Sequence, residues 1–221
     1  MVLLQCFNLL LHKIDNTKLE IIGEDTGSSS QTPPSPDTSL AQCTQLLSHF
    51  AKLREMPVPV DGILDRLVSL DIAGCNNITR LPAAYGNNGC MRSLNISSTK
   101  ISAIPASISQ TLTALDVSSC RRVTNVGDIP NLVVLNCTNS AVVDINPVTL
   151  LSLRQLFAFH TKLSTISNAM QLEIMSWSPS LSGTLTIGNA PRLLSVLVTS
   201  GRDNVHLDGD SEAIVQMVGG T

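Results

Sequence analysis

The chain has 221 residues, of which 43% are hydrophobic and 14% are charged, and its formal net charge is −3. This length and apolar content predict a packed domain rather than a disordered chain. The mild charge and the lack of a Lys/Arg run disfavour a nucleic acid as partner. The six cysteines include no Cys-x-x-Cys pair, so the spacing of a metal site is missing and we expect no metal or other cofactor.

The first residues, MVLLQCFNLLLHK, are apolar but do not have the pattern of a targeting or membrane segment. No basic stretch precedes the apolar run, no small-residue cleavage site follows it, and the run is too short to cross a bilayer. We therefore expect an intracellular, cytoplasmic protein without a membrane partner. Residues 1–26 as a whole fit a strand or a helix–strand piece equally well.

The next segment changes composition twice before the repeats begin. Residues 27–38, GSSSQTPPSPDT, have the Ser/Pro content of a flexible linker. Residues 39–60 are predicted to contain an amphipathic helix with Ser39 as its N-cap, which would cover the open end of a repeat domain. Its apolar residues recur at helical spacing: Leu40, Cys43, Leu47, Phe50 and Leu53 or Met56.

Between residues 61 and 207 the chain repeats one short motif seven times. Each copy has apolar residues at its first, fourth and sixth positions and a small residue at its ninth. The copies begin 19 to 24 residues apart, at Leu67, Met91, Leu112, Leu132, Leu153, Leu172 and Leu193. In LTALDVSSC, for example, Leu115 and Val117 alternate with Asp116 and Ser118, which predicts a short strand with one buried face.

The pattern resembles that of the leucine-rich-repeat family, LxxLxLxxN/CxL, whose period is about 20–29 residues. The resemblance implies an α/β solenoid, a horseshoe with a parallel β-sheet on its concave face. Proline follows an apolar residue in three of the return segments, at Pro82, Pro105 and Pro130. Because proline lacks an N–H and fixes φ, we expect these returns to be extended, 3₁₀ or short helical segments.

The ninth position of the repeats departs from the family, which usually has Asn or Cys there. The resemblance implies that this side chain bonds to the backbone of the adjacent coil. Cys, Ser and Thr can do so more weakly than an amide, which predicts less regular coils. The seven residues are Cys75, Thr99, Cys120, Ser140, Thr161, Ser180 and Gly201.

Cys120 is the candidate for catalysis, because Arg121 and Arg122 follow it and could lower the pKa of its thiol. A nucleophilic cysteine also needs a positioned base, and no histidine lies nearby in the sequence. The ninth-position role explains this cysteine without chemistry. We therefore expect a turn residue in a protein that is not an enzyme.

Two further motifs have structural explanations. The sequons at Asn95 and Asn136 lie on the solvent face of predicted strands, where small polar residues recur, and a third is at Asn77. The acidic segment 203–212, DNVHLDGDSE, lacks the spacing of a calcium loop. We expect neither glycosylation nor calcium there, but a solvated acidic segment and a short tail, 208–221, in which SEAIVQMV forms a short helix.

The outward positions of the predicted strands change character along the chain. They are small and polar in the first four repeats, whereas the later repeats add Phe157, Phe159, Ile174 and Leu197. Two phenylalanines on one strand indicate a binding surface, since clustered exposed aromatics often mark one. The alternative is a register shift that turns both rings inward and Ala158 outward.

The resemblance implies a protein–protein interaction module, and we expect a non-catalytic one that binds a protein partner through the concave sheet. The alternative is a structural subunit of a larger complex, which packs through its ends and its convex side. The predicted contact residues are Phe157, Phe159, His160 and Ile174, with Asp71, Asn95, Asp116 and Asn136 as a polar continuation. Trp177 falls at an inward position and is expected in the core.

Overall fold

The computed structural model describes Met56 and residues 68–86, 89–179, 183–199, 204–208 and 213–217. The segment 1–26, the linker 27–38 and nearly all of the helix predicted within 39–60 lie outside these residues. Met56 is the exception, and it is buried in the core.

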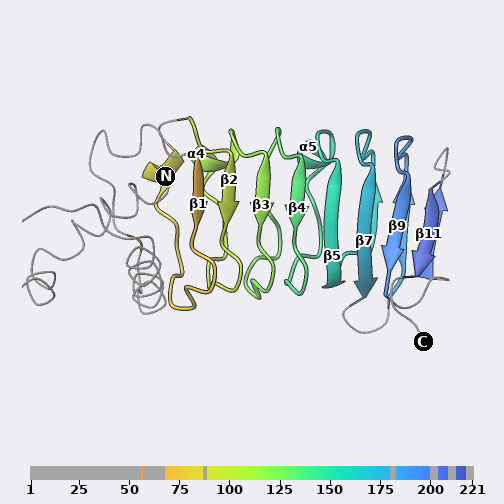
Figure 1. The fold of residues 1–221 in the computed structure, drawn as a ribbon, viewed down its shortest axis with the longest axis horizontal. Helices are drawn as coiled ribbons and strands as arrows, with labels where there is room; N and C mark the ends of the chain where they lie inside the picture. Colours follow the sequence, from red (N-terminus) through yellow and green to blue (C-terminus); the bar gives the residue numbers. More distant parts are fainter. Residues whose placement is uncertain are drawn as a thin grey trace, which may run out of the picture.

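Eight strands in the described part of the chain form one parallel sheet, in which they lie side by side in sequence order (Figure 1). The fourth positions of successive repeats are in register, with Leu70 beside Leu94, Leu115 and Leu135. This arrangement confirms the predicted solenoid with a parallel sheet. The strands are β1 (Ser69–Asp71), β2 (Ser93–Asn95), β3 (Ala114–Asp116), β4 (Val134–Asn136), β5 (Gln155–Thr161), β7 (Ile174–Pro179), β9 (Ser195–Val198) and β11 (Ile214–Met217).

The return segments change from short helices to strands along the solenoid. The earlier returns hold the 3₁₀ helix η1 (Ala83–Gly86) and the helical turns α4 (Ala106–Ser109) and α5 (Pro147–Leu150). The later ones form a second parallel sheet in the order β10-β8-β6. Its strands are β6 (Thr165–Ser167), β8 (Leu185–Gly188) and β10 (Val205–Asp208). Extended, 3₁₀ and short helical returns are what the prolines predict.

The core is a stack of thin layers, one per coil. In the β3 coil, Leu115 of the strand and Val117, which follows the strand, pack with Val123 and Val126 of the return, and all four are buried. Every buried side-chain nitrogen and oxygen in the described residues has a hydrogen-bond partner. Because each layer contacts mainly the next, stability is close to a sum of coil and interface contributions.

The C-terminal part differs from the sequence prediction. The helix predicted in SEAIVQMV is wrong, because Ile214–Met217 is strand β11, and the sheet therefore extends beyond residue 207. The N–H of Ile214 donates to the carbonyl of Leu194 at 3.0 Å. The edge of β9 presents unpaired backbone groups to which this segment can bond as a strand. A single helical turn is less favourable, because helix nucleation fixes several residues for one hydrogen bond.

The acidic segment 203–212 is also more than a solvated stretch, as far as the structure describes it. Val205–Asp208 forms β10, which pairs with β8. His206 and Asp208 are exposed, but Val205 and Leu207 pack against the core. The alternation of these four residues, apolar then polar, is the signal that predicts a strand here.

Candidate partner-binding face

The outward-pointing side chains of the eight-stranded sheet, called the sheet face below, include both phenylalanines of β5. Leu156 and Ala158 are fully buried, whereas Phe157 and Phe159 are half-buried. The alternative of a register shift that turns the rings inward is therefore wrong. Trp177 lies in the core as predicted, and its Nε1–H donates to the carbonyl of Leu163 at 3.0 Å.

Four apolar side chains gather on β5, β7 and β9, and we call them the apolar patch: Phe157, Phe159, Ile174 and Leu197. Phe157 is in register with Ser176, which is in register with Leu197. Neighbouring strands are about 4.8 Å apart, so the larger side chains stand on both sides of this serine. Ser176 points outward but is buried, which indicates that its larger neighbours close over it.

His160 lies at the end of the apolar patch, on an exposed irregularity of β5. Its φ of 54° is left-handed, and the pairing with β7 shifts register between Phe159 and Thr161. The backbone N–H of His160 donates to Ser178 Oγ at 3.1 Å, and its Nδ1 lies 3.5 Å from the same oxygen. The structure thus brings His160 to β7, beside the predicted aromatic residues.

The first four strands end in Asp or Asn, and we call these residues the Asx ladder: Asp71, Asn95, Asp116 and Asn136. Each Oδ1 accepts the backbone N–H two residues later, at 2.8 to 3.2 Å, which is the geometry of an Asx turn. The amides also bond across coils. Asn95 Nδ2 donates to Asp71 Oδ2 at 3.1 Å, and Asn136 Nδ2 donates to Asp116 Oδ2 at 2.9 Å.

The Asx ladder explains the difference in strand length along the sheet. In β1 to β4 the Asx oxygen takes an N–H that would otherwise continue the strand ladder, and these strands have three residues each. Phe157 occupies the same position in β5 but has no oxygen to accept that N–H, and β5 runs for seven residues. The polar and apolar halves of the face are therefore built differently.

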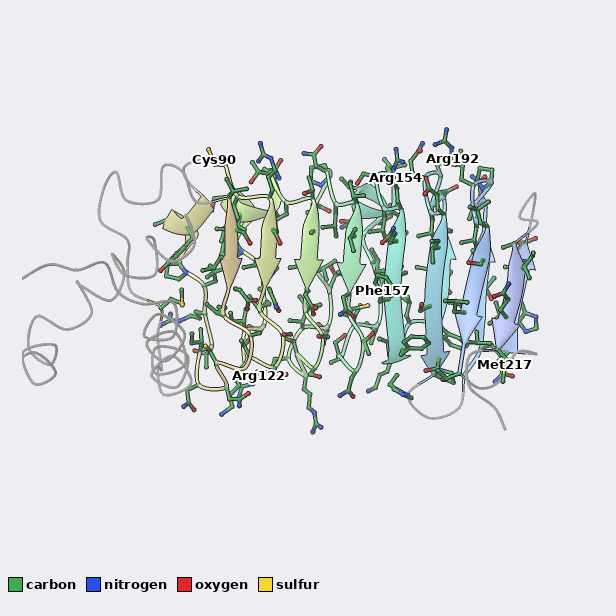
Figure 2. The ribbon with its side chains drawn as sticks, viewed as in Figure 1. Cys90, Arg122, Arg154, Phe157, Arg192 and Met217 are labelled. Carbon is green, nitrogen blue, oxygen red and sulfur yellow. The ribbon has the colours of Figure 1, made fainter. Side chains whose placement is uncertain are left out.

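The charges are arranged in a simple way around the sheet face. Among the described strand residues of this sheet that point outward, Asp71 and Asp116 are acidic and no Lys or Arg is present. Figure 2 shows Arg154 and Arg192 on the rim where the strands begin and Arg122 on the opposite rim. Arg154 pairs with Glu173 at 3.3 Å, and Arg192 donates to Gln171 Oε1 at 2.8 Å.

Cys120 has the structural role that its ninth position predicts. It is buried, and its thiol donates to the carbonyl of Ile96 in the preceding coil at 3.0 Å. Burial raises the pKa of Cys120, and it raises the pKa of Cys137 to about 12. Arg121 and Arg122 are exposed to solvent. A protonated, buried thiol is not a nucleophile.

Alkylation of the native protein with iodoacetamide near neutral pH is expected to leave Cys120 unmodified. Its raised pKa keeps the thiol protonated at a pH where a free cysteine already forms some thiolate. Peptide mapping by mass spectrometry should show Cys120 reacting no faster than Cys75 or Cys137, and all three reacting after denaturation. Preferential labelling of Cys120 in the native protein would instead support the interpretation of Cys120 as a nucleophile.

The fold and this face define a solenoid of parallel β-coils with one open, partly aromatic sheet face. The described residues contain no cluster of three or more His, Cys, Asp or Glu side chains that could hold a metal ion. No helix in the described part of the chain has the length and apolar character needed to span a bilayer.

Comparison with known proteins shows a likeness to solved structures but no relative by sequence. No family model matches the sequence, and no curated protein matches it. Among solved structures, the chain is similar to the crystal structure of a TLR13–ssRNA13 complex, with 17% identity and a TM-score of 0.46. The match covers 81% of this chain and 31% of that one. It does not bear on function.

Proposed function

We propose that this chain is a non-catalytic interaction module that binds a protein partner through the sheet face. The observation that carries the proposal is the apolar patch, in which Phe157 and Phe159 project from one strand although the chain has only four phenylalanines. Aromatic side chains that are already held by their neighbours cost little entropy on binding and are frequent anchors of interfaces.

The Asx ladder suggests the chemistry of the rest of the partner. Asp71 and Asp116 are separated by two strand spacings, about 10 Å, and no cation faces them from the described strands. A segment with Lys or Arg over β1 to β3 and apolar side chains over β5 to β9 would complement both halves. A polyanion would meet two carboxylates instead, which favours a protein over a nucleic acid.

The double variant Phe157→Ala/Phe159→Ala is expected to lose its partners in affinity purification, because it removes both anchors. For a binding energy concentrated in such anchors we expect a loss of about 2 kcal/mol or more, which corresponds to about thirtyfold in the dissociation constant. The measurement is quantitative mass spectrometry of co-purified proteins, followed by titration of the partner identified.

The matched control is Arg121→Ala/Arg122→Ala, which truncates two exposed side chains on the rim of the solenoid, away from the apolar patch. It should retain the partners that wild type captures. Thermal unfolding of both variants checks that the fold survives. Partners that bind the phenylalanine variant as well as wild type would contradict a binding site at the apolar patch.

A further inference from the structure

The residues at the fifth position of the repeats form one continuous row across the sheet face, called the central row below. Each is in register with its neighbour on the next strand, so the row crosses the strands and follows the length of the solenoid (Figure 1). All of its side chains except the buried serine are at least partly accessible. The central row consists of Asp71, Asn95, Asp116, Asn136, Phe157, Ser176 and Leu197.

In the polar half of the central row, the side chains are joined in pairs that span two coils. Asn95 donates to Asp71, and Asn136 donates to Asp116. The amide oxygens of both asparagines accept backbone N–H groups, so their amides are used within the Asx ladder. Both oxygens of each aspartate accept a hydrogen bond, and each keeps a second lone pair. A ligand group that donates hydrogen bonds, above all a cation, therefore fits at Asp71 and at Asp116.

The apolar half of the central row continues the same period of two coils. Phe157 and Leu197 point outward from β5 and β9, and Ser176 of the strand between them is buried. Phe157 in turn follows Asp116 by two strands. Contacts for a ligand therefore recur about 9.6 Å apart, because neighbouring strands are about 4.8 Å apart. The four contact positions are Asp71, Asp116, Phe157 and Leu197.

A polyproline II segment has a repeat that matches this spacing. It has three residues per turn and rises about 3.1 Å per residue, so every third side chain lies on the same side, about 9.3 Å from the last. From the first contact position to the fourth, nine such residues cover about 28 Å, and the six strand spacings cover about 29 Å. The mismatch over the whole row is thus only about 1 Å.

The two other regular conformations fit the central row less well. In an α-helix the nearest comparable repeat is seven residues, about 10.5 Å, so the mismatch reaches about 3 Å at the fourth contact position. In a β-strand, side chains on one side are about 6.7 Å apart, and every third side chain points to the opposite side. Either conformation would lose contacts at one end of the row.

We propose that the central row binds a proline-rich segment of a protein partner in the polyproline II conformation. This inference rests on the proposed function and specifies the chemistry of its partner. Two Lys or Arg side chains, three residues apart, contact Asp71 and Asp116, and prolines at the next two such intervals contact Phe157 and Leu197. Segments of this kind commonly dock on aromatic side chains, and their preformed conformation lowers the entropy lost on binding.

Fluorescence anisotropy of labelled peptides tests the proposal on the full chain. The probe is KPAKPAPPAP, which has lysine or proline at every third position from the first. The control is KPAPKAPPAP, which has the same composition but exchanges two neighbouring residues. The probe is expected to bind about fivefold more tightly, because the control cannot place both lysines over the aspartates. The reversed sequences of both peptides test the opposite chain direction.

The variant Asp71→Asn/Asp116→Asn tests the role of the carboxylates. Asparagine already forms the same Asx turn at the alternate positions of the row, so the fold should survive, and thermal unfolding checks this. The variant should bind the probe about fivefold more weakly than wild type and should not distinguish it from the control peptide. Wild-type binding should weaken as salt is added, whereas binding by the variant should depend less on salt.

The matched control for the protein is Asp128→Asn/Asp144→Asn, which removes two exposed acidic groups from the return segments. It changes the net charge by the same amount but leaves the central row intact, so it should bind the probe like wild type. Weaker binding by this control would show that the peptide responds to net charge and not to the row.

Two further results would overturn the inference. The first is an absence of binding, or equal affinity for probe and control peptide, in both chain directions. The second is equal binding of the probe by wild type and by Asp71→Asn/Asp116→Asn. In either case the proposed function still stands if Phe157→Ala/Phe159→Ala loses the partners of wild type. If that variant keeps them, the proposed function itself fails.

Discussion

Replacing Trp177 by alanine is expected to lower the free energy of unfolding by about 3–5 kcal/mol, the range for truncating a large aromatic side chain in a core. Trp177 is 1% exposed and is among the largest fully buried side chains in the described residues. It lies in register with Ala158 on one side and Val198 on the other. Neither small neighbour can fill the space that its removal would leave.

The hydrogen bond of Trp177 adds to this cost. Its Nε1–H donates to the carbonyl of Leu163, in the loop between β5 and β6. Without the indole this buried carbonyl loses its donor, which costs about 1–3 kcal/mol unless water reaches it. Trp177 therefore connects the eight-stranded sheet to the return that leads into the second sheet.

Urea unfolding followed by circular dichroism measures the effect, and Trp177→Phe is the informative comparison. Phenylalanine keeps most of the apolar volume but cannot donate a hydrogen bond to Leu163. We therefore expect the free energy of unfolding of Trp177→Phe to lie between those of wild type and Trp177→Ala. Equal stability of wild type and Trp177→Ala would show that this side chain is not part of the packed core.

The pairing of Trp177 with Ala158 also explains why the aromatic residues of β5 point outward. A small residue at an inward position of one strand makes room for a large one on the next. The sequence contains this signal, since both residues fall at inward positions of the repeat. This signal alone could have excluded the register shift, because a large and a small inward residue at matching positions of adjacent coils fill the space between them.

The strand positions were predictable because burial alternates with a period of two and the repeats fix the register. Leu94, Leu115 and Leu135 are in register on successive strands, as their fourth positions predict. The hydrogen bonds of the Asx ladder were not predicted, although Asp and Asn alternate at the fifth position of the first four repeats. Whether Asn95 and Asn136 reach back to the preceding carboxylate depends on side-chain rotamers, which the periodicity does not specify.

The C-terminal strands could be predicted only in part, because their partners are distant in sequence. Ile214–Met217 has apolar residues that fit one turn of helix as well as a strand, and four residues do not resolve the two periods. Pairing with the edge of β9 makes this segment a strand rather than a helix. The second sheet likewise depends on three returns that stack in register, whereas each return alone is only an extended segment.

Gly86→Ala is the second substitution expected to have a large effect, a loss of about 3 kcal/mol in the free energy of unfolding. Gly86 ends η1 and is buried against α4 of the next coil. A Cβ at this position would lie 2.4 Å from the carbonyl carbon of Ser107 and 2.5 Å from the nitrogen of Ile108. Both are backbone atoms, so no side-chain rotation can relieve the contact.

The close approach at Gly86 is fixed by a further bond between the two coils. Ser107 Oγ donates to the carbonyl of Ala83 at 2.7 Å, which holds η1 and α4 together. A methyl group at Gly86 must push the coils apart and stretch this bond. Because coils contact mainly their neighbours, the damage should be confined to the N-terminal coils, and hydrogen exchange should quicken there and stay slow around β5 to β9.

Gly188→Ala in β8 is the matched control, since a Cβ there meets no atom within 4 Å. Its stability should stay within about 0.5 kcal/mol of wild type or rise slightly, because alanine loses less conformational entropy than glycine in a strand. The contrast isolates the contact between coils from the general effect of replacing glycine. If urea unfolding shows the same stability for both variants, η1 and α4 do not touch as described, and the spacing of the first coils is looser than the rest.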